Sequence, residues 1–103
     1  MTPVTLALVN GRIRTNDPRR PVADAVAVAG ELLALVGSSA EVRKLAGSGA
    51  RVIDLRGATL FPDPAEAVLR RGASANLVVR SAEHDGDELL RMREGRITTD
   101  RFS

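Results

Sequence analysis

Short apolar runs alternate with glycine-containing turns along the whole chain. Residues 4–10 form an apolar segment that ends in Asn10-Gly11, and residues 12–15 then alternate polar and apolar side chains. Because Asn and Gly tolerate the positive φ angles of a type I′ turn, this pattern predicts a hairpin between two short strands.

The same pattern occurs twice more. Residues 22–29 place valines on one face and alanines on the other, and Gly30-Glu31 joins them to the apolar run 32–36. Near the other end of the chain, residues 89–93 and 96–99 flank Glu94-Gly95. Both segments predict hairpins. Further strands are expected over 51–55, 58–61 and 76–80, with a turn at Arg56-Gly57.

One segment has the signals of a short helix. Ser38 and Glu41 have the spacing of a capping box, in which each side chain satisfies a backbone N–H of the first turn. Val42 and Leu45 lie one turn apart on a single face, and Gly47 is placed to end the helix.

A second helix is predicted over residues 63–71. Asp63 is a suitable N-cap, Pro64 fits the first helical position, and Gly72 follows as a stop signal. Ala65, Val68 and Leu69 would form the buried stripe. With about eight short strands and two short helices, the chain is predicted to be mainly β, a small β-sandwich or barrel-like domain over residues 1–103.

The composition excludes several kinds of site but does not identify a function. The chain has 103 residues, no cysteine and only two aromatic side chains, Phe61 and Phe102. Disulfides and thiolate metal sites are therefore excluded. No apolar run reaches the ~20 residues of a membrane-spanning helix, and no positively charged signal start is present, so a cytoplasmic location is expected.

The high isoelectric point does not indicate nucleic-acid binding. The formal charge is only +2, and almost nothing titrates between the carboxylates and the arginines. Fourteen arginines against one lysine fit the codon bias of a GC-rich bacterial genome. The basic doublets Arg19-Arg20 and Arg70-Arg71 lack aromatic stacking partners, and the second is explained by a helix C-terminus. Neither a nucleic acid nor a membrane is expected as a partner.

The polar clusters do not form a recognisable catalytic or binding site. Glu83, His84, Asp85 and Asp87 could be read as metal ligands, but a solvated loop is the better interpretation because catalytic zinc needs three fixed protein ligands. Asp54 is expected to face solvent or a turn at a strand end.

Serines and glycines give no catalytic signal either. Ser38 and Ser39 are explained as a helix cap, and Gly47-Ser48-Gly49 precedes a strand, whereas a phosphate loop needs a following helix. We predict no catalytic, cofactor-binding or metal-binding residues, no cofactor and no small-molecule ligand.

The order of segments resembles the metal-dependent amidohydrolase superfamily. Residues 8–15, 25–28, 35–37 and 52–62 are similar in sequence and order to the N-terminal part of that family, and the likeness spans residues 6–62. The resemblance implies a small β-sandwich that stands beside a catalytic TIM-type barrel.

The resemblance continues at the other end of the family, with the barrel missing between. Residues 72–79 (GASANLVV) are similar to the segment that returns from the barrel, with Asn76 where the family has Asp, and residues 92–97 resemble its closing hairpin. The His-x-His motif expected after Phe61-Pro62 is absent. Only 41 residues follow Pro62, whereas a barrel needs roughly 200. Residues 63–71 would join the two halves, 1–62 and 72–103.

Three functional hypotheses follow. The first is a non-catalytic domain that binds a second copy of itself, as a homodimer, or another protein. The second is an accessory subunit that completes a metal-dependent hydrolase of C–N bonds with a separately encoded barrel. The third is a truncated remnant without a selected function.

Overall fold

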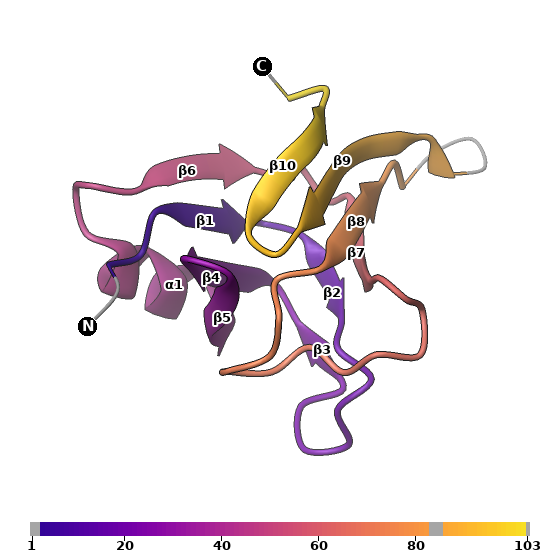
Figure 1. The fold of residues 1–103 in the computed structure, drawn as a ribbon, viewed down its shortest axis with the longest axis horizontal. Coiled ribbons are helices and arrows are strands. Elements are labelled where there is room, and N and C mark those ends of the chain that lie inside the picture. Colours follow the sequence, from indigo (N-terminus) through magenta and orange to yellow (C-terminus); the bar gives the residue numbers. More distant parts are fainter. Residues whose placement is uncertain (1–2, 83–85, 103) are drawn as a thin grey trace.

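Two β-sheets pack against each other and share one core, with a helix on the far side of one sheet (Figure 1). The computed structural model describes residues 3–82 and 86–102. Sheet A has the strand order β5-β4-β1-β6, and sheet B has the order β10-β9-β8-β7-β2-β3. The elements are β1 (Leu6–Val9), β2 (Arg12–Arg14), β3 (Val22–Ala23), β4 (Ala25–Ala29), β5 (Leu32–Gly37), α1 (Ser39–Ala46), β6 (Arg51–Asp54), β7 (Thr59–Pro62), β8 (Leu77–Arg80), β9 (Glu88–Arg93) and β10 (Arg96–Asp100).

The predicted fold class is confirmed, since the protein is mainly β with two sheets. The described residues form ten strands and one helix, where about eight strands and two helices were expected. The segment 22–29, predicted as one strand, is divided between the two sheets into β3 and β4.

The hairpin predicted at the Asn10-Gly11 turn is wrong. β1 pairs with β4 and β6 in sheet A, whereas β2 pairs with β3 and β7 in sheet B. The chain therefore crosses from one sheet to the other at this turn. Glycine fits at position 11 for a steric reason: a Cβ atom there would lie 2.5 Å from the Leu55 side chain.

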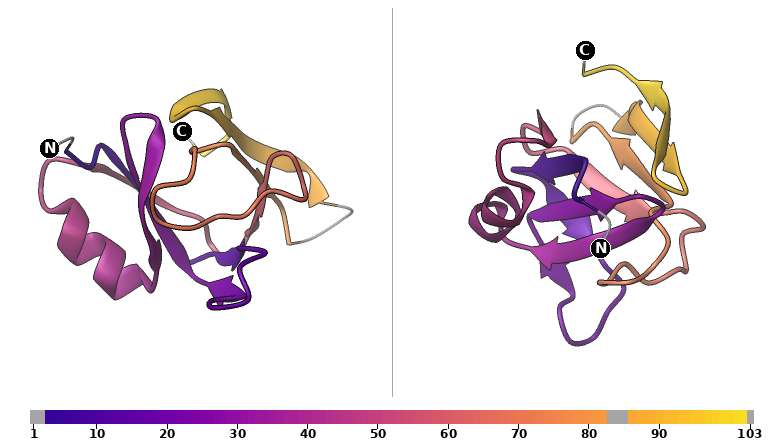
Figure 2. Two further views of the ribbon diagram at one scale, coloured as in Figure 1. Left: turned by 60° about the horizontal axis from the view of Figure 1, so that its bottom comes forward. Right: turned by 60° about the vertical axis from the view of Figure 1, so that its left-hand side comes forward.

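The Arg56-Gly57 turn makes the same crossing beside it. β6 runs parallel to β1 in sheet A, and β7 runs parallel to β2 in sheet B. The two crossings are tied by a hydrogen bond from the Gly57 N–H to the Asn10 carbonyl at 2.8 Å. Two bent, parallel chain segments thus connect the sheets, an arrangement visible in Figure 2.

The other two predicted hairpins are confirmed. In β4–β5, Ala29 pairs with Leu32 across the two-residue turn, and in β9–β10, Arg93 pairs with Arg96. Glu94 and Gly95 have φ angles of 49° and 79°, as the centre of a type I′ turn requires.

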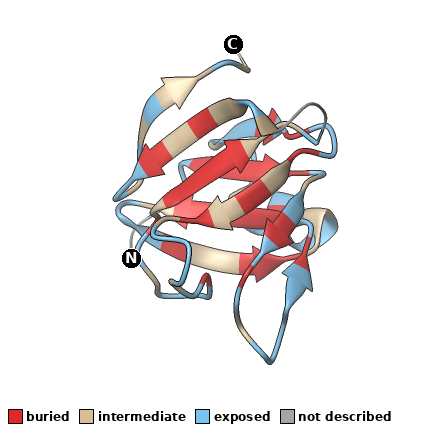
Figure 3. Ribbon diagram, turned by 90° about the vertical axis from the view of Figure 1, so that its right-hand side faces the viewer, coloured by how far each residue is buried: buried red, intermediate tan, exposed pale blue. Residues whose placement is uncertain are grey.

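The main core lies between the sheets and is built almost entirely from aliphatic side chains. Figure 3 shows buried residues along the central strands and exposed residues in the connecting loops. A second, smaller core lies between sheet A and α1. The predicted alternation in β4 is confirmed, because Val26 and Val28 enter the main core while Ala25 and Ala27 face Val42 of the helix.

The first predicted helix is confirmed with its cap. The Ser38 hydroxyl accepts a hydrogen bond from the Glu41 N–H, the Glu41 carboxylate accepts one from the Ser38 N–H, and Gly47 ends the helix. Leu45 was expected on the buried face with Val42 but is 49% exposed. The helix packs on β1, β4 and β5. Only a narrow stripe of helix side chains contacts the alanines of the sheet below it.

The second predicted helix is wrong. Residues 63–71 form turns and extended chain, and the Pro64 carbonyl accepts a single helix-like bond, from Ala67. Ala65 is exposed, Val68 is 38% exposed and Leu69 is buried. The local signals are overridden because most backbone bonds of this segment go to residues outside it: the Leu69 N–H donates to the Thr15 carbonyl, and the Ala65 and Ala67 carbonyls accept from the Asn16 side chain.

Candidate interaction surface

Residues 63–76 close the end of the sandwich between the two sheets. The Leu69 side chain is 1% exposed and belongs to the main core. Its N–H donates to the Thr15 carbonyl beside sheet B at 2.8 Å. The Gly72 N–H donates to the Leu33 carbonyl, and the Leu33 N–H donates to the Ala73 carbonyl, both at 2.8 Å. This junction therefore connects the two sheets at this end and covers the core there.

A side chain from the loop after β2 holds the start of the junction. The Asn16 amide nitrogen donates to the Ala65 carbonyl at 2.7 Å and to the Ala67 carbonyl at 2.9 Å. Asn16 adopts a φ angle of 59°, which asparagine tolerates better than most residues. In a helix these two carbonyl groups would accept hydrogen bonds from backbone N–H groups, and here they accept them from the Asn16 side chain instead.

We call the surface of sheet B that is turned away from sheet A the outer face. Phe61 pairs with Val78, and Val78 pairs with Arg91, so these three side chains form one row across β7, β8 and β9. Their neighbours along the strands, Leu60, Val79 and Leu90, are fully buried in the core. The alternation of strand side chains therefore places the row on the outer face.

Arg91 is held on this face by two carboxylates. Its Nη1 lies 2.8 Å from Asp63 Oδ2, and its Nη2 lies 2.7 Å from Glu88 Oε1. The hydrogen bond from Arg91 holds the pKa of Glu88 below its ordinary value, and the same bond raises the pKa of Arg91. The cluster links β9 to the start of the junction.

A shallow hollow of about 280 Å³ lies beside this cluster. Its floor is apolar, and its rim carries charged groups. The lining residues are Phe61, Pro62, Asp63, Ala65, Val78, Arg80 and Arg91. The outer face thus combines a small apolar centre with both signs of charge.

Two further arginines lie on the outer face, near the β9–β10 turn. Arg93 and Arg96 are exposed and stand directly opposite each other across the β9–β10 turn. Neither takes part in an ion pair within residues 3–82 and 86–102. Directly opposed like charges on neighbouring strands are destabilising.

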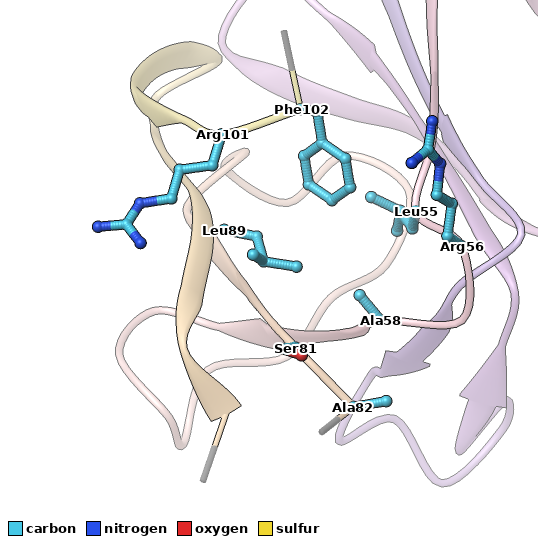
Figure 4. Close-up of a pocket in the computed structure, with 8 residues that line it drawn as sticks. All are labelled: Leu55, Arg56, Ala58, Ser81, Ala82, Leu89, Arg101 and Phe102. Atoms are coloured by element: carbon cyan, nitrogen blue, oxygen red, sulfur yellow. The ribbon is translucent and has the colours of Figure 1, made fainter. Parts of the chain in front are cut away.

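A second hollow of about 310 Å³ opens at the other end of the sandwich (Figure 4). Phe102 and Leu89 approach it from one sheet and Leu55 from the other, and the Arg101 side chain points away from it. The Phe102 ring packs against the main core at this opening. The aromatic side chain thus fills part of the gap between the sheets.

The serine and aspartate candidates of the sequence have structural roles. Ser39 binds Asp24 with its hydroxyl at 2.9 Å and accepts a hydrogen bond from the Asn10 N–H, so it ties the helix to the sheets. The Asp54 carboxylate accepts a hydrogen bond from the Arg56 N–H, which holds the pKa of Asp54 below its ordinary value. Asp54 is exposed at a strand end, as expected.

Among the described residues, the remaining candidates lie in separate segments. Glu83, His84 and Asp85 lie outside the described residues. Gly47-Ser48-Gly49 follows α1 and precedes β6, so it does not begin a helix. Arg19-Arg20 lies in the loop before β3, where Arg20 approaches Glu41 at 4.0 Å. Arg70-Arg71 was expected to close a helix and instead lies in the non-helical junction.

Within the part of the chain that the structure describes, no group of three or more His, Asp or Glu side chains could hold a metal ion. No helix there is long and apolar enough to cross a membrane.

The outer-face residues were missed by sequence reasoning, although a signal was present. In β9, Arg91 and Arg93 alternate with the buried Leu90 and Met92. A period of two with arginine on the exposed side could have identified a charged sheet face. The ion pair with Asp63 could not have been found, because the junction was read as a helix.

Comparison with known proteins places these features in a family context. No protein-family model matches the chain. It is 42% identical over 57 residues to an N-substituted formamide deformylase of Arthrobacter pascens, a match that covers 55% of this chain and 10% of that protein. The chain therefore spans about a tenth of the length of this curated relative.

Solved structures give a similar result. The protein BT9727_2919 of Bacillus thuringiensis matches with a TM-score of 0.55 and 32% identity, over 60% of this chain and 82% of that one. An enamidase, described as a member of the amidohydrolase superfamily, matches with a TM-score of 0.44 and 32% identity, over 55% of this chain and 15% of that one. The chain resembles a small domain of the amidohydrolase superfamily, which confirms the family predicted from its sequence.

Proposed function

We propose that this amidohydrolase-like domain is non-catalytic and acts by associating with protein, either a second copy of itself or another chain. The observation that carries the proposal is the closure of the sandwich by residues 63–76. Leu69 fills the core at the point where the family continues into its barrel, and the surrounding backbone bonds to both sheets. The scaffold is therefore complete without the part that would hold a catalytic metal.

Three further features support an association role. The chain contains one histidine, so the several-histidine site of the family has no counterpart within its 103 residues. The outer face of sheet B carries an apolar hollow bordered by charges, which is the composition of a polar protein interface. Arg93 and Arg96 are opposed like charges whose repulsion a partner's carboxylates would relieve.

The sequence match to a formamide deformylase favours one second candidate, an accessory subunit that completes a hydrolase with a separate barrel. This candidate requires a surface for the barrel near the ends of β7 and β8. Leu69 and its backbone partners occupy that position, so docking there would displace a buried side chain.

The test combines an activity assay with an association assay. The purified chain, with Zn²⁺ added, is incubated with an N-substituted formamide, and its mass is measured by light scattering over a wide concentration range. A tagged chain is also recovered from its source organism under crosslinking. We expect no hydrolysis and a stoichiometric complex with itself or another protein. Metal-dependent hydrolysis, or a chain that is always monomeric and recovers no protein, would contradict the proposal.

A further inference from the structure

We propose that the outer face of sheet B is the contact surface of a twofold dimer of this chain. This inference rests on the proposed function and names both the surface and the partner. The eight outer-face residues that it uses are Phe61, Asp63, Val78, Arg80, Glu88, Arg91, Arg93 and Arg96.

The unpaired arginines lie on the outer face because of the strand register. Ile97 pairs with Met92, which is fully buried in the core, so the next residues in each strand, Arg96 and Arg93, point the other way. A single subunit leaves this pair of guanidinium groups opposed and without a carboxylate among the described residues. Glu94 occupies the turn between them but forms no ion pair with either in that part of the chain.

The carboxylate that would complement Arg96 is that of Asp63, which lies at the opposite margin of the same face and also pairs with Arg91. Leu77 pairs with Met92, and the Asp63 N–H donates to the Asn76 carbonyl, so Asp63, Asn76, Arg93 and Arg96 stand at one level across the strands. This row runs from an acid on the β7 side to two bases on the β9–β10 side. In the row at the other end of the face, Arg80 on β8 pairs with Glu88 on β9.

A twofold axis makes these rows complementary. Sheets that pack face to face keep their strands within about 30° of parallel. An axis parallel to the strands and between β8 and β9 exchanges β8 with β9 and β7 with β10. It places Arg96 of one copy over Asp63 of the second copy, and Arg80 over Glu88 of the second copy. Each contact occurs twice because the interface is isologous.

The mixed charge of the face favours a protein over an anionic polymer. Asp63 and Glu88 interrupt the arginines of this face, whereas a nucleic-acid surface carries a sustained basic stripe. In the middle row the same axis places Val78 over the Arg91 side chain of the second copy and Phe61 over Thr99 of the second copy, between the two charged rows. Since exposed charge pairs are screened by salt, the dimer is expected to weaken as ionic strength rises.

The experiment uses two charge-reversal variants. Each should form a weaker dimer by itself, and a mixture of the two should form a heterodimer. In Arg96→Asp, the aspartate meets Asp63 of the second copy, and in Asp63→Arg, two arginines meet. By sedimentation velocity at low salt, each variant alone should have a dimer dissociation constant raised on the order of tenfold or more. In a mixture, both contacts become attractive, and a heterodimer should form with near wild-type affinity.

Two controls separate this effect from misfolding. Lys44→Asp makes the same change of charge sign on α1, which packs on the far side of sheet A, and should leave the dimer unchanged. Arg96→Asp removes the like-charge opposition to Arg93, so at a concentration where both proteins are monomeric its Tm should be equal to or higher than that of the wild type. If Asp63→Arg does not fold, Arg80→Glu supplies the test in the other row, since it then faces Glu88 of the second copy and should weaken the dimer.

The outcomes are distinct from those of the proposed function. A wild-type dimer that is unaffected by Arg96→Asp and by Arg80→Glu would overturn this surface while leaving association intact. A wild-type chain that stays monomeric at low salt would overturn the dimer, and recovery of a different protein by the tagged chain would then still support the proposed function.

Discussion

Gly95, in the β9–β10 turn, lies against the carbonyl group of Gly30 in the β4–β5 turn. A Cβ atom at Gly95 would overlap the Gly30 oxygen and come 3.2 Å from the Glu31 Cα atom. The tips of two hairpins from different sheets are therefore in backbone contact. This contact, together with the junction, sets how the two sheets meet at this end of the sandwich.

Gly95→Ala is expected to lower the free energy of unfolding strongly, because the new methyl group meets rigid backbone. Gly57→Ala is the matched control, since Gly57 has a similar φ angle, 83° against 79°, but open space around it. The control should lose about 1–2 kcal/mol from the left-handed backbone alone. The Gly95 variant should lose about 1–3 kcal/mol more from overpacking. If both variants lose the same free energy of unfolding in urea, the β9–β10 and β4–β5 turns are not in close contact.

The turns of the β4–β5 and β9–β10 hairpins could be predicted because the residues that determine their conformation are neighbours in the sequence. A type I′ turn requires positive φ at both central positions, and Glu94-Gly95 meets that requirement within four residues of sequence. Asn10-Gly11 carries the same local signal but lies where the chain crosses between sheets. Its conformation is decided by pairing with β6 and β7, more than forty residues away, which no short pattern records.

The candidate surface was less predictable than the fold. The outer face depends on which strands are neighbours, because Asp63, Glu88 and Arg91 meet only when β7, β8 and β9 lie side by side. The prediction of a helix in the junction failed for a related reason. Its Asp-Pro start has good helix signals, but Leu69 gains more from the core than a single helical turn provides.

Leu69→Ala tests whether the junction seals the core. Truncation of a fully buried leucine should lower the free energy of unfolding by about 2–5 kcal/mol. The neighbouring Val68→Ala is the control, because Val68 is 38% exposed and its loss should be well below that of Leu69. Both values come from chemical denaturation with a common m-value. A loss below about 1 kcal/mol for Leu69→Ala would mean that the core closes without the junction.

Ser38→Ala removes one half of the capping box of α1. The Glu41 N–H would lose its acceptor, and the free energy of unfolding should fall by about 1 kcal/mol. Ser48→Ala serves as the control, since Ser48 is exposed after the helix and its side chain makes no hydrogen bond among the described residues. If circular dichroism melts of the two variants coincide, the cap contributes nothing measurable.

The Glu88–Arg91 pair predicts how stability changes with pH. The hydrogen bond from Arg91 holds the folded-state pKa of Glu88 below its ordinary value of 4.5. The carboxylate is therefore harder to protonate in the folded chain than in the unfolded one, and the pair stabilises the fold fully above pH 4.5. This contribution should disappear as the pH falls from 4.5 through the folded-state pKa.

Glu88→Gln removes that dependence, so the difference in stability between wild type and variant should be largest at neutral pH and shrink in acid. Glu31→Gln is the control for the substitution itself, because Glu31 is exposed and forms no ion pair within the described residues. Urea titrations at a series of pH values measure both differences. A wild-type advantage over Glu88→Gln that persists unchanged in acid would show that Arg91 stabilises this face through packing and not through its charge.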